Sequence, residues 1–343
     1  MIKFLIKNLL PLIVLLGFLA GWFLPAPGKW GYSLNLVYPC TFLVFLLQGM
    51  SVDIKALKQI RQCSSAVLIG ALASQALAPF LGSLMLPYIH EDFKVGFALI
   101  CVMGPTLVSG TVIASSAGAE KATCIMITIL VNILAVFMIP FTLKYMIGAE
   151  VDLNPASLLI KLMLIVLLPA IIGQLICLKK PAIRTDFARG IKFAPIYILG
   201  FIIYMSVSKN SDELRDVETT KMLSLILPSL FVHFMCFAAI WYSAKLVKMK
   251  WGYKVAVAFV ASQKTLPVAV AVWSMAFDKE HTFAVVAIIV FHMVQIYFDG
   301  MLAPFVASAD EGKIEELTIP EDSIEAEGPN AAEETDAPED SQD

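Results

Sequence analysis

The amino-acid sequence predicts an all-α integral membrane protein with ten transmembrane helices, arranged as a five-plus-five inverted repeat. Three observations lead to this fold class. Hydrophobic residues make up 59% of the 343 residues, and charged residues make up 15%. Apolar stretches long enough to cross about 30 Å of hydrocarbon recur from Phe4 to Val306. The fourth and the ninth of these stretches are interrupted by polar residues and proline.

The connections between the predicted spans differ in charge, and this difference predicts a topology. Fifteen lysine and arginine residues fall on the side of both termini, and eight fall on the other side. Because short cytoplasmic loops carry the excess of these residues, we expect both termini in the cytoplasm and a multi-pass protein of the cell (plasma or inner) membrane. The expected spans lie near residues 4–24, 33–50, 65–88, 95–117, 121–146, 157–178, 190–208, 222–246, 253–277 and 281–306.

The acidic residues gather at the C-terminal end of the chain. Residues 310–343 contain fourteen acids and one base, whereas residues 1–309 contain fourteen acids and twenty-four bases. The acidic stretch lacks aromatic residues and cannot bury a core. We therefore expect a transmembrane domain of residues 1–309 and a disordered tail of residues 310–343. The tail is either a solvated segment or a segment that binds a protein partner, which the sequence does not identify.

The two halves of the chain repeat short patterns. Residues 12–16 and 164–168 both read Leu-Ile-Val-Leu-Leu, and Thr106 in the fourth span corresponds to Thr265 in the ninth, each followed by leucine. Five spans followed by five spans place the two halves in opposite orientations, because five is odd. Interrupted helices at corresponding positions of two inverted halves indicate a transport site.

Lys264 lies deep within the ninth predicted span, in the apolar stretch of residues 255–277. A charge at that depth is costly in hydrocarbon, so its side chain must face the protein interior or a wet cavity. Pro267 follows closely and cannot donate a backbone hydrogen bond. The pattern therefore predicts a broken, polar helix that lines a binding site, with Gln263 and Thr265 beside the lysine.

The fourth span carries a second break, at Gly104-Pro105-Thr106, which Ser109 and Thr111 follow. Proline and glycine free backbone groups near the bilayer centre, and a substrate or an ion can supply the missing partners. The N-terminal end of a half-helix attracts an anion, and the C-terminal end attracts a cation. The alternative is a proline kink whose free backbone groups are satisfied by neighbouring hydroxyls.

Further polar residues within the spans are candidates for the same site. Gln75 lies well inside the third span, and Thr123, Thr128 and Asn132 lie along the fifth. Thr128 and Asn132 are four residues apart, so they share a helix face. Polar residues also join membrane helices by hydrogen bonds worth about 0.6–2 kcal/mol, which gives each of these residues a structural alternative.

Three titratable residues, His233, His292 and Asp299, lie in the last spans. A histidine can relay protons, but a single histidine is more often a packed and hydrogen-bonded residue. For Asp299 we expect a charge at the cytoplasmic end of the last helix.

The sequence contains no Gly-x-Ser-x-Gly, His-Glu-x-x-His or phosphate-binding Gly-x-x-x-x-Gly-Lys-Ser/Thr pattern, and the six cysteines stand singly. These absences argue against an enzyme, a metal centre and ATP-driven transport. Secondary transport is the function that the intramembrane pattern favours. A membrane regulator or scaffold that acts through the acidic tail is the alternative from another class.

The order and spacing of these motifs resemble the bile acid:sodium symporter family, in particular its divergent sodium/bile-acid cotransporter-like branch. The resemblance covers residues 4–306 and rests on the ten spans and on four motifs. Two of them are Phe-Leu-Leu-Gln-Gly-Met-Ser at residues 45–51 and Gln-Ala-Leu-Ala-Pro at residues 75–79. The interrupted segments around Thr106 and Lys264 are the other two.

The resemblance implies a panel domain with spans near 4–50 and 157–208, and a core domain with spans near 65–146 and 222–306. Helices four and nine would be discontinuous and would cross in the core. An organic anion such as a bile acid, a steroid conjugate or a small carboxylate would bind between the two domains and move by alternating access. The implied partners are this anion and the lipid bilayer, without nucleic acid. The expected binding residues are Gln75, Thr106, Ser109, Thr111, Thr123, Thr128, Gln263, Lys264 and Thr265.

Sodium coupling is the point at which the chain departs from the family. The resemblance places a weak sodium site at Gln75, Ser109, Thr123 and Gln263. However, Phe259 and Gly110 stand where the family has a glutamate and an asparagine, and hard cations need several oxygen ligands. The alternative hypothesis is an anion carrier, proton-coupled or uncoupled, in which the Lys264 ammonium replaces sodium. Burial disfavours the charged amine, which is the reason to include protons. No cofactor other than sodium is expected.

Overall fold

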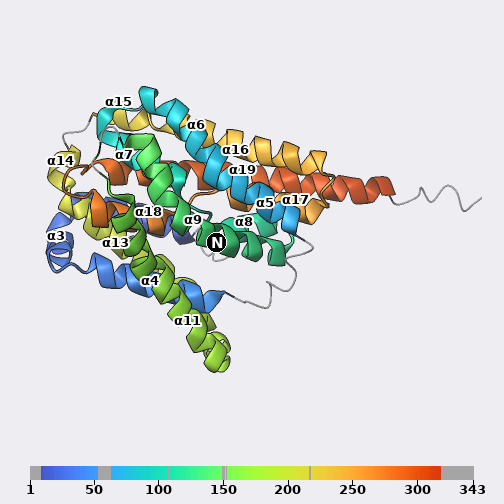
Figure 1. The fold of residues 1–343 in the computed structure, drawn as a ribbon, viewed down its shortest axis with the longest axis horizontal. Helices are drawn as coiled ribbons and strands as arrows, with labels where there is room; N and C mark the ends of the chain where they lie inside the picture. Colours follow the sequence, from blue (N-terminus) through green and yellow to red (C-terminus); the bar gives the residue numbers. More distant parts are fainter. Residues whose placement is uncertain are drawn as a thin grey trace, which may run out of the picture.

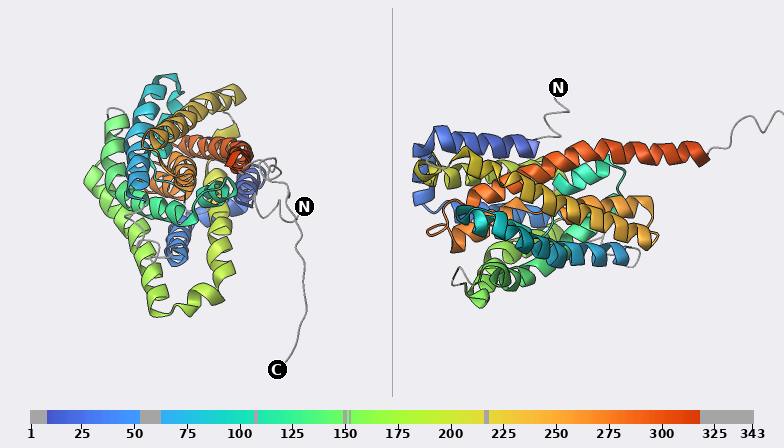
Figure 2. Two further views of the ribbon diagram at one scale, coloured as in Figure 1. Left: turned by 90° about the vertical axis from the view of Figure 1, so that its right-hand side faces the viewer. Right: turned by 90° about the horizontal axis from the view of Figure 1, so that it is seen from above.

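The computed structural model describes residues 9–52, 63–106, 109–148, 151, 153–215 and 218–317, and the regular structure of these residues is helical (Figure 1). Most helices run roughly along one axis (Figure 2). Within the described residues, the α-helices of eight or more residues are α2 (Leu9–Phe23), α3 (Pro25–Ser33), α4 (Val37–Ser51), α5 (Ser64–Leu72), α6 (Ala78–Met85), α7 (Glu91–Val102), α8 (Ser109–Ser116), α9 (Lys121–Ile147), α10 (Pro155–Leu162), α11 (Leu168–Lys179), α13 (Ala188–Lys209), α16 (Ile226–Leu246), α17 (Trp251–Ser262), α18 (Leu266–Ala276) and α19 (Ala284–Leu317).

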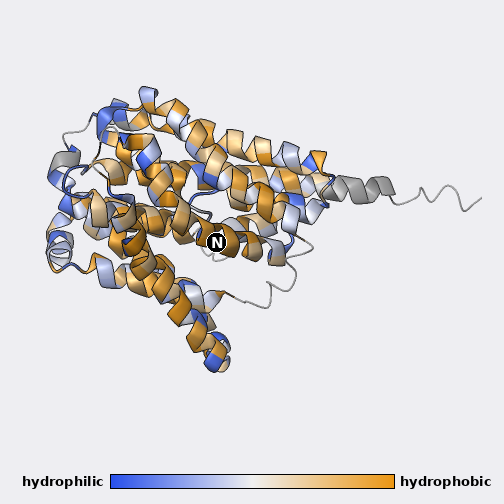
Figure 3. Cartoon of the chain, viewed as in Figure 1, coloured by the Kyte–Doolittle hydropathy of each residue, from blue (hydrophilic) through white to orange (hydrophobic). Residues whose placement is uncertain are grey.

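The protein is an all-helical membrane protein. Seven helical segments among the described residues are long and apolar enough to cross a bilayer, and the pair α2 and α3, bent by 98°, makes an eighth if it counts as one span. Apolar residues cover most of the helix surfaces, and hydrophilic residues gather toward the ends of the bundle (Figure 3).

The predicted count of ten spans is not established by helix length and composition. The second predicted span is α4, which has 15 residues, and the fourth is divided between α7 and α8. At the C-terminal end, α19 continues to Leu317, past the predicted start of the acidic tail. Residues 318–343, and with them most of that tail, lie outside the described residues.

The helices pack in two groups. In the first group, α13 lies against α2, α3 and α4, and α4 also lies against α11. In the second group, α17 is enclosed by α5, α8, α9 and α16, and α19 packs on α7 and α16. In the segment from α17 to α18, 94% of the apolar 18-residue stretch is buried inside the protein. In the segment from α10 to α11, the corresponding share is 28%. The second group therefore contains the interior of the protein, and the outer helices face lipid.

Proline accounts for the two broken spans. Pro105 disfavours helical geometry at the residue before it, and α7 ends at Val102 with Met103 already extended. Pro267 lies in the first turn of α18, where its missing N–H is harmless, so a new helix begins at Leu266. Between the helices the backbone of Gln263 and Thr265 is extended.

A third irregularity lies between α5 and α6, where residues Ala73–Leu77 form a π-helical turn. In π-helical register, the amide of residue 79 would bond to the carbonyl of residue 74. Residue 79 is proline and has no amide hydrogen. The carbonyl of Ser74 is thereby left free inside the protein, and it becomes part of the candidate site.

Candidate functional site

The two helix breaks lie against each other. The backbone amide of Thr265 donates a hydrogen bond of 2.9 Å to the carbonyl of Gly104. The gap between α7 and α8 thus contacts the gap between α17 and α18, although about 160 residues separate them in the sequence. The sequence analysis predicts that Thr106 and Thr265 belong to one site, and the structure brings their two segments together. We call this contact region, residues 103–106 and 262–265, the crossing.

Lys264 is fully buried at the crossing. Its Nζ atom donates to the carbonyl of Ser74 at 2.6 Å, to the Ser74 hydroxyl at 3.0 Å and to the carbonyl of Met103 at 3.0 Å. An ammonium group has three hydrogens, so these three acceptors satisfy it completely. All three partners are neutral oxygens, and the lysine forms no direct ion pair among the described residues.

Two features of the backbone explain why a positive charge is tolerated there. Met103 caps the C-terminal end of α7, where unpaired carbonyls and the helix dipole favour a cation. The Ser74 carbonyl is free because Pro79 cannot bond to it in the π-helical turn. The ammonium therefore occupies the position at which a bound cation would satisfy the same oxygens.

Gln263 connects the second break to the first. Its Oε1 atom accepts a hydrogen bond of 2.8 Å from the Thr106 hydroxyl and lies 3.5 Å from the Ser109 hydroxyl. Ser109 also donates to Thr106 at 3.0 Å, and the amide of Gly110 donates to the same Thr106 oxygen at 2.8 Å. Three of the predicted site residues thus form one buried polar cluster.

Asp299 is a further candidate for the site, and its predicted position at a helix end is wrong. The expected charge at a helix end is fully buried instead. Its Oδ2 atom accepts a hydrogen bond of 2.5 Å from Nε2 of Gln263, and its Oδ1 atom lies 2.8 Å from Nε2 of His233. The residue lies in the middle of α19 because that helix is longer than predicted, continuing to Leu317.

Residues of α19 also hold the backbone of Lys264. Gln295 accepts from the Lys264 amide at 2.8 Å and donates to the Lys264 carbonyl at 2.7 Å. The Gln295 amide nitrogen lies 2.8 Å from Nδ1 of His292, closer than the 3.2 Å between Nδ1 and the Lys264 carbonyl. We therefore assign Nδ1 as an acceptor and the ring hydrogen to Nε2. That Nε2 atom is buried and has no partner among the described residues.

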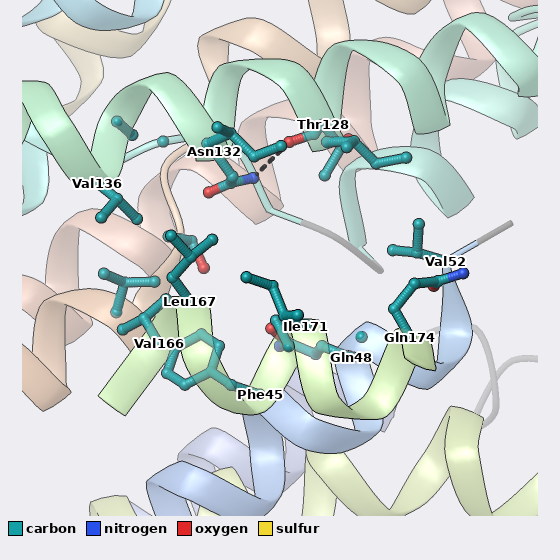
Figure 4. Close-up of a pocket in the computed structure, with 18 of the residues that line it drawn as sticks. Phe45, Gln48, Val52, Thr128, Asn132, Val136, Val166, Leu167, Ile171 and Gln174 are labelled. Carbon is teal, nitrogen blue, oxygen red and sulfur yellow. Dashed lines mark hydrogen bonds between the residues drawn. The ribbon is translucent and has the colours of Figure 1, made fainter. Parts of the chain in front are cut away.

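A cavity of about 260 Å³ lies between the two helix groups, beside the crossing (Figure 4). Helix α4 and the helices around α11 form one wall, α9 forms the other, and Gly104 and Thr265 close one side. Asn132 of α9 lines it and donates to the carbonyl of Pro105 at 2.9 Å and to that of Thr128 at 2.8 Å. Its polar lining residues are Gln48, Thr128, Asn132, Gln174 and Thr265.

A smaller cavity of about 40 Å³ adjoins this one and shares Gln48 and Thr265 with it. Thr106, Ser109 and His292 also line the smaller cavity. The lining thus combines the hydroxyl side chains of the first break with the imidazole of His292. Together the two cavities present an apolar volume that ends in polar side chains.

The remaining predicted residues lie apart from the crossing cluster. Gln75 is half-buried and donates to the Ser74 hydroxyl at 3.1 Å, so it reaches Lys264 only through Ser74. Thr123 is in the first turn of α9, where the Glu120 side chain caps its amide. The Thr128 hydroxyl donates to a carbonyl of its own helix, and Thr111 is partly exposed on α8.

The two expected departures from a sodium site are visible in the packing. Phe259 is fully buried and lies edge-on against Phe237, with ring centroids 5.1 Å apart, so the position supplies no oxygen. A Cβ atom at Gly110 would lie 2.9 Å from the Thr106 hydroxyl and 3.1 Å from Oε1 of Gln263. A longer side chain at this position would therefore crowd the polar cluster.

Comparisons with known proteins identify the family of this chain. A model of the SBF-like CPA transporter family matches residues 7–308. The chain is 26% identical to the probable sodium/metabolite cotransporter BASS4, chloroplastic, of Oryza sativa subsp. indica, over 89% of this chain and 77% of that protein. The protein of the same name in Arabidopsis thaliana is 27% identical, over 88% and 73% of the two chains.

A more distant relative comes from an animal. Sodium/bile acid cotransporter 7 of Xenopus tropicalis is 22% identical to this chain, over 80% of this chain and 83% of that protein. These relatives and the family match confirm the resemblance found in the sequence, and they place the chain among transporters and not among enzymes. The protein belongs to the SBF-like CPA transporter family.

Proposed function

We propose that the protein is a secondary active transporter that carries organic anions across its membrane by alternating access. The observation that carries this proposal is the cavity between the two helix groups, which ends at two broken helices. An apolar metabolite body fits the larger cavity, and an anionic head group would lie at its polar end, where the smaller cavity adjoins. The relatives are named as a sodium/metabolite cotransporter and a sodium/bile acid cotransporter, and these names support this class of substrate.

The proposed architecture has ten spans in a five-plus-five inverted repeat. The seven long apolar segments, the bent pair of α2 and α3, the short helix α4 and the broken pair of α7 and α8 make ten. The contact between the breaks of the fourth and ninth spans supports two related halves. The helix group around α13 would be the panel, and the group around α17 would be the core. The excess of basic residues supports cytoplasmic termini.

The described conformation supports a carrier that is closed at one end. The cavity follows the C-terminal half of α4, from Phe45 to Val52. Beyond the other end of α4, Lys209 and Tyr32 bond to Asp278, at 2.6 and 2.7 Å, and join the panel to the segment after α18. On the proposed topology this closed end is extracellular, so the cavity faces the cytoplasm. Transport would require these bonds to break.

In this proposal the ammonium group of Lys264 replaces the coupling cation. Its ammonium satisfies the end of α7 and the free Ser74 carbonyl, which otherwise need a bound ion. The positive charge also attracts an anion toward the crossing. Sodium coupling is the second candidate, because the relatives are named for it and because oxygens of Thr106, Ser109 and Gln263 converge.

The test is the melting temperature of the purified protein with cholate, a sulfated steroid or pyruvate, with and without sodium. A ligand at one hundred times its Kd stabilises the folded state by about 2.7 kcal/mol. We expect at least one anion to raise the melting temperature without sodium, and we expect the Lys264→Ala variant to lose this shift. No stabilisation by any organic anion would contradict transport of this class. A shift that requires sodium would favour the second candidate.

A further inference from the structure

Asp299 and His233 form a buried acid–base pair that has no role in the proposed anion site. Their side chains are both inaccessible to solvent, and Nε2 of His233 lies 2.8 Å from Oδ1 of Asp299. Helix α16 supplies the histidine and α19 supplies the aspartate, so the pair lies within the core group. A buried carboxylate is costly unless a partner or a proton neutralises it.

The contacts of the pair provide positions for two protons. The other ring nitrogen of His233, Nδ1, lies 3.3 Å from the carbonyl oxygen of Ser262, which can only accept. The contact of 2.8 Å between Nε2 and Oδ1 also has room for a hydrogen, on the imidazole or on the carboxyl. The pair can therefore hold one proton more than a neutral imidazole beside a carboxylate, without any change in its contacts.

Gln263 joins this pair to the crossing. Its amide nitrogen donates to Asp299, and its amide oxygen accepts from Thr106. An amide has fixed donor and acceptor ends, so the bond to Asp299 sets which end faces the Thr106 hydroxyl. A change in the charge of the pair therefore alters the partner that orients the anion-site hydroxyls.

The other titratable groups near the pair belong to each element packed around it. Lys264 follows α17, but its ammonium points to Ser74 and Met103 and not toward Asp299. On α19 itself, His292 lies at the carbonyl of Lys264. The thiols of Cys236 on α16 and Cys101 on α7 are buried nearby, on the lysine side. Lys264 is therefore the group of opposite charge that balances Asp299 across the crossing.

The charges of Asp299, His233 and Lys264 give a rule for coupling. Without the extra proton the three groups sum to zero charge, and with it they sum to one positive charge. A bound monoanion cancels that charge. The empty core and the core that holds both proton and anion are therefore neutral, whereas a core with only one of them is charged. Because net charge is costly at membrane depth, only the two neutral forms can switch between the inward-facing and the outward-facing state.

We propose that the Asp299–His233 pair is a proton-binding site that takes up one proton with each organic anion. The inference rests on the proposed function, because it needs an anion to be transported. It assigns the driving ion to a pair of residues outside the anion site. No bond other than those to the proton forms or breaks in the step.

The first arm of the test uses the wild-type protein in liposomes that contain the pH dye pyranine. The probes are taurocholate and the small sulfonate isethionate, which stay anionic near neutral pH and cannot carry a proton themselves. We expect an acidic exterior to drive uptake of at least one of them and the lumen to acidify as it enters. Because the loaded core is neutral, we expect the rate to be insensitive to membrane potential.

The second arm uses the Asp299→Asn variant, whose amide can keep hydrogen bonds to Gln263 and His233. Its core stays positively charged when empty and is neutral only with an anion bound. We therefore expect proton-driven net uptake to fall by at least about tenfold while exchange of internal for external anion continues. Asp186→Asn, which removes an exposed carboxylate on the short helix at residues Ala182–Asp186, is the matched control and should retain both activities.

Each result of the test separates the two proposals. Uptake of an anion without acidification of the lumen would overturn the proton site and leave the proposed function standing. Net uptake that is undiminished in Asp299→Asn would do the same. No uptake of either anion under any gradient would overturn the proposed function, and the proton site with it. If the variant does not fold, the acidification measured with the wild-type protein still decides.

Discussion

The two broken helices of the core contain different chemistry. The break between α7 and α8 supplies carbonyls from Met103 and Gly104 and hydroxyls from Thr106 and Ser109. The break between α17 and α18 supplies the cation Lys264, and Gln263 carries its contact to Asp299. The first break therefore supplies mostly oxygen acceptors. The second supplies the positive charge of Lys264 and, through Gln263, the contact to Asp299.

This difference shows how a pair of broken helices can be stable without a bound ion. A helix that ends inside a membrane leaves carbonyls that need a partner. In this protein the partner of the α7 end is a side chain from the other break, covalently held at the site. The two breaks are therefore complementary, and a substitution in either one should remove a hydrogen-bond partner from the other.

Removing the charge should have the largest effect. In Lys264→Ala, the Met103 and Ser74 carbonyls lose their donor, and an unsatisfied buried polar group costs about 1–3 kcal/mol. On the proposed function the anion also loses the charge that attracts it, and we expect a loss of about 100-fold, as for the removal of one preorganised donor from an enzyme site. We expect both a lower melting temperature and a loss of uptake.

Lys245→Ala on the exposed end of α16 is the matched control for this prediction, since it removes the same charge from a solvated position. It should leave the melting temperature and the uptake of the anion nearly unchanged. If Lys264→Ala transports as well as the control does, the second break does not supply the charge that the site needs.

Removing one hydroxyl from the first break should have a smaller effect. Thr106→Val keeps the side-chain volume but deletes the 2.8 Å bond to Gln263 and the acceptor for the Gly110 amide. The unpaired groups should cost about 1–3 kcal/mol, and the same free energy lost from anion binding would weaken the affinity by about 5- to 150-fold.

Thr41→Val offers a comparison for Thr106→Val, because the Thr41 hydroxyl is also buried but donates to a carbonyl of its own helix. We expect it to change the affinity measured by titration of the melting temperature much less. Equal effects of the two substitutions would mean that the hydroxyl of Thr106 is only a packing element.

The amino-acid sequence predicts the parts of the site that depend on local chemistry. Pro105 and Pro267 mark both breaks, and the depth of Lys264 within an apolar stretch requires an enclosed position. The pairing of the breaks is predicted from their corresponding positions in the two proposed halves, and the bond between Thr265 and Gly104 agrees with it. The two prolines and the lysine are features of single helices, which sequence patterns report well.

The features that the sequence analysis does not find depend on packing between helices. Ser74 contacts Lys264 through a carbonyl that Pro79 frees in a π-helical turn, and no sequence pattern distinguishes that turn from an ordinary kink. The sequence predicts Asp299 as a charge at a helix end, because its partners, His233 and Gln263, come from other parts of the chain. Its position inside an apolar segment could have indicated burial. The predicted span ends at residue 306, whereas α19 continues to Leu317, so the aspartate lies farther from the helix end than the sequence indicates.

We propose that Lys264 stands where a coupling cation would otherwise bind. Taurocholate uptake by wild-type protein in liposomes, at fixed pH and with sodium replaced stepwise by N-methylglucamine, tests this role of the lysine. We expect an initial rate that does not change with sodium concentration. A rate that rises steeply and saturably with sodium would contradict it, because a bound sodium ion would then supply the charge that we assign to the lysine.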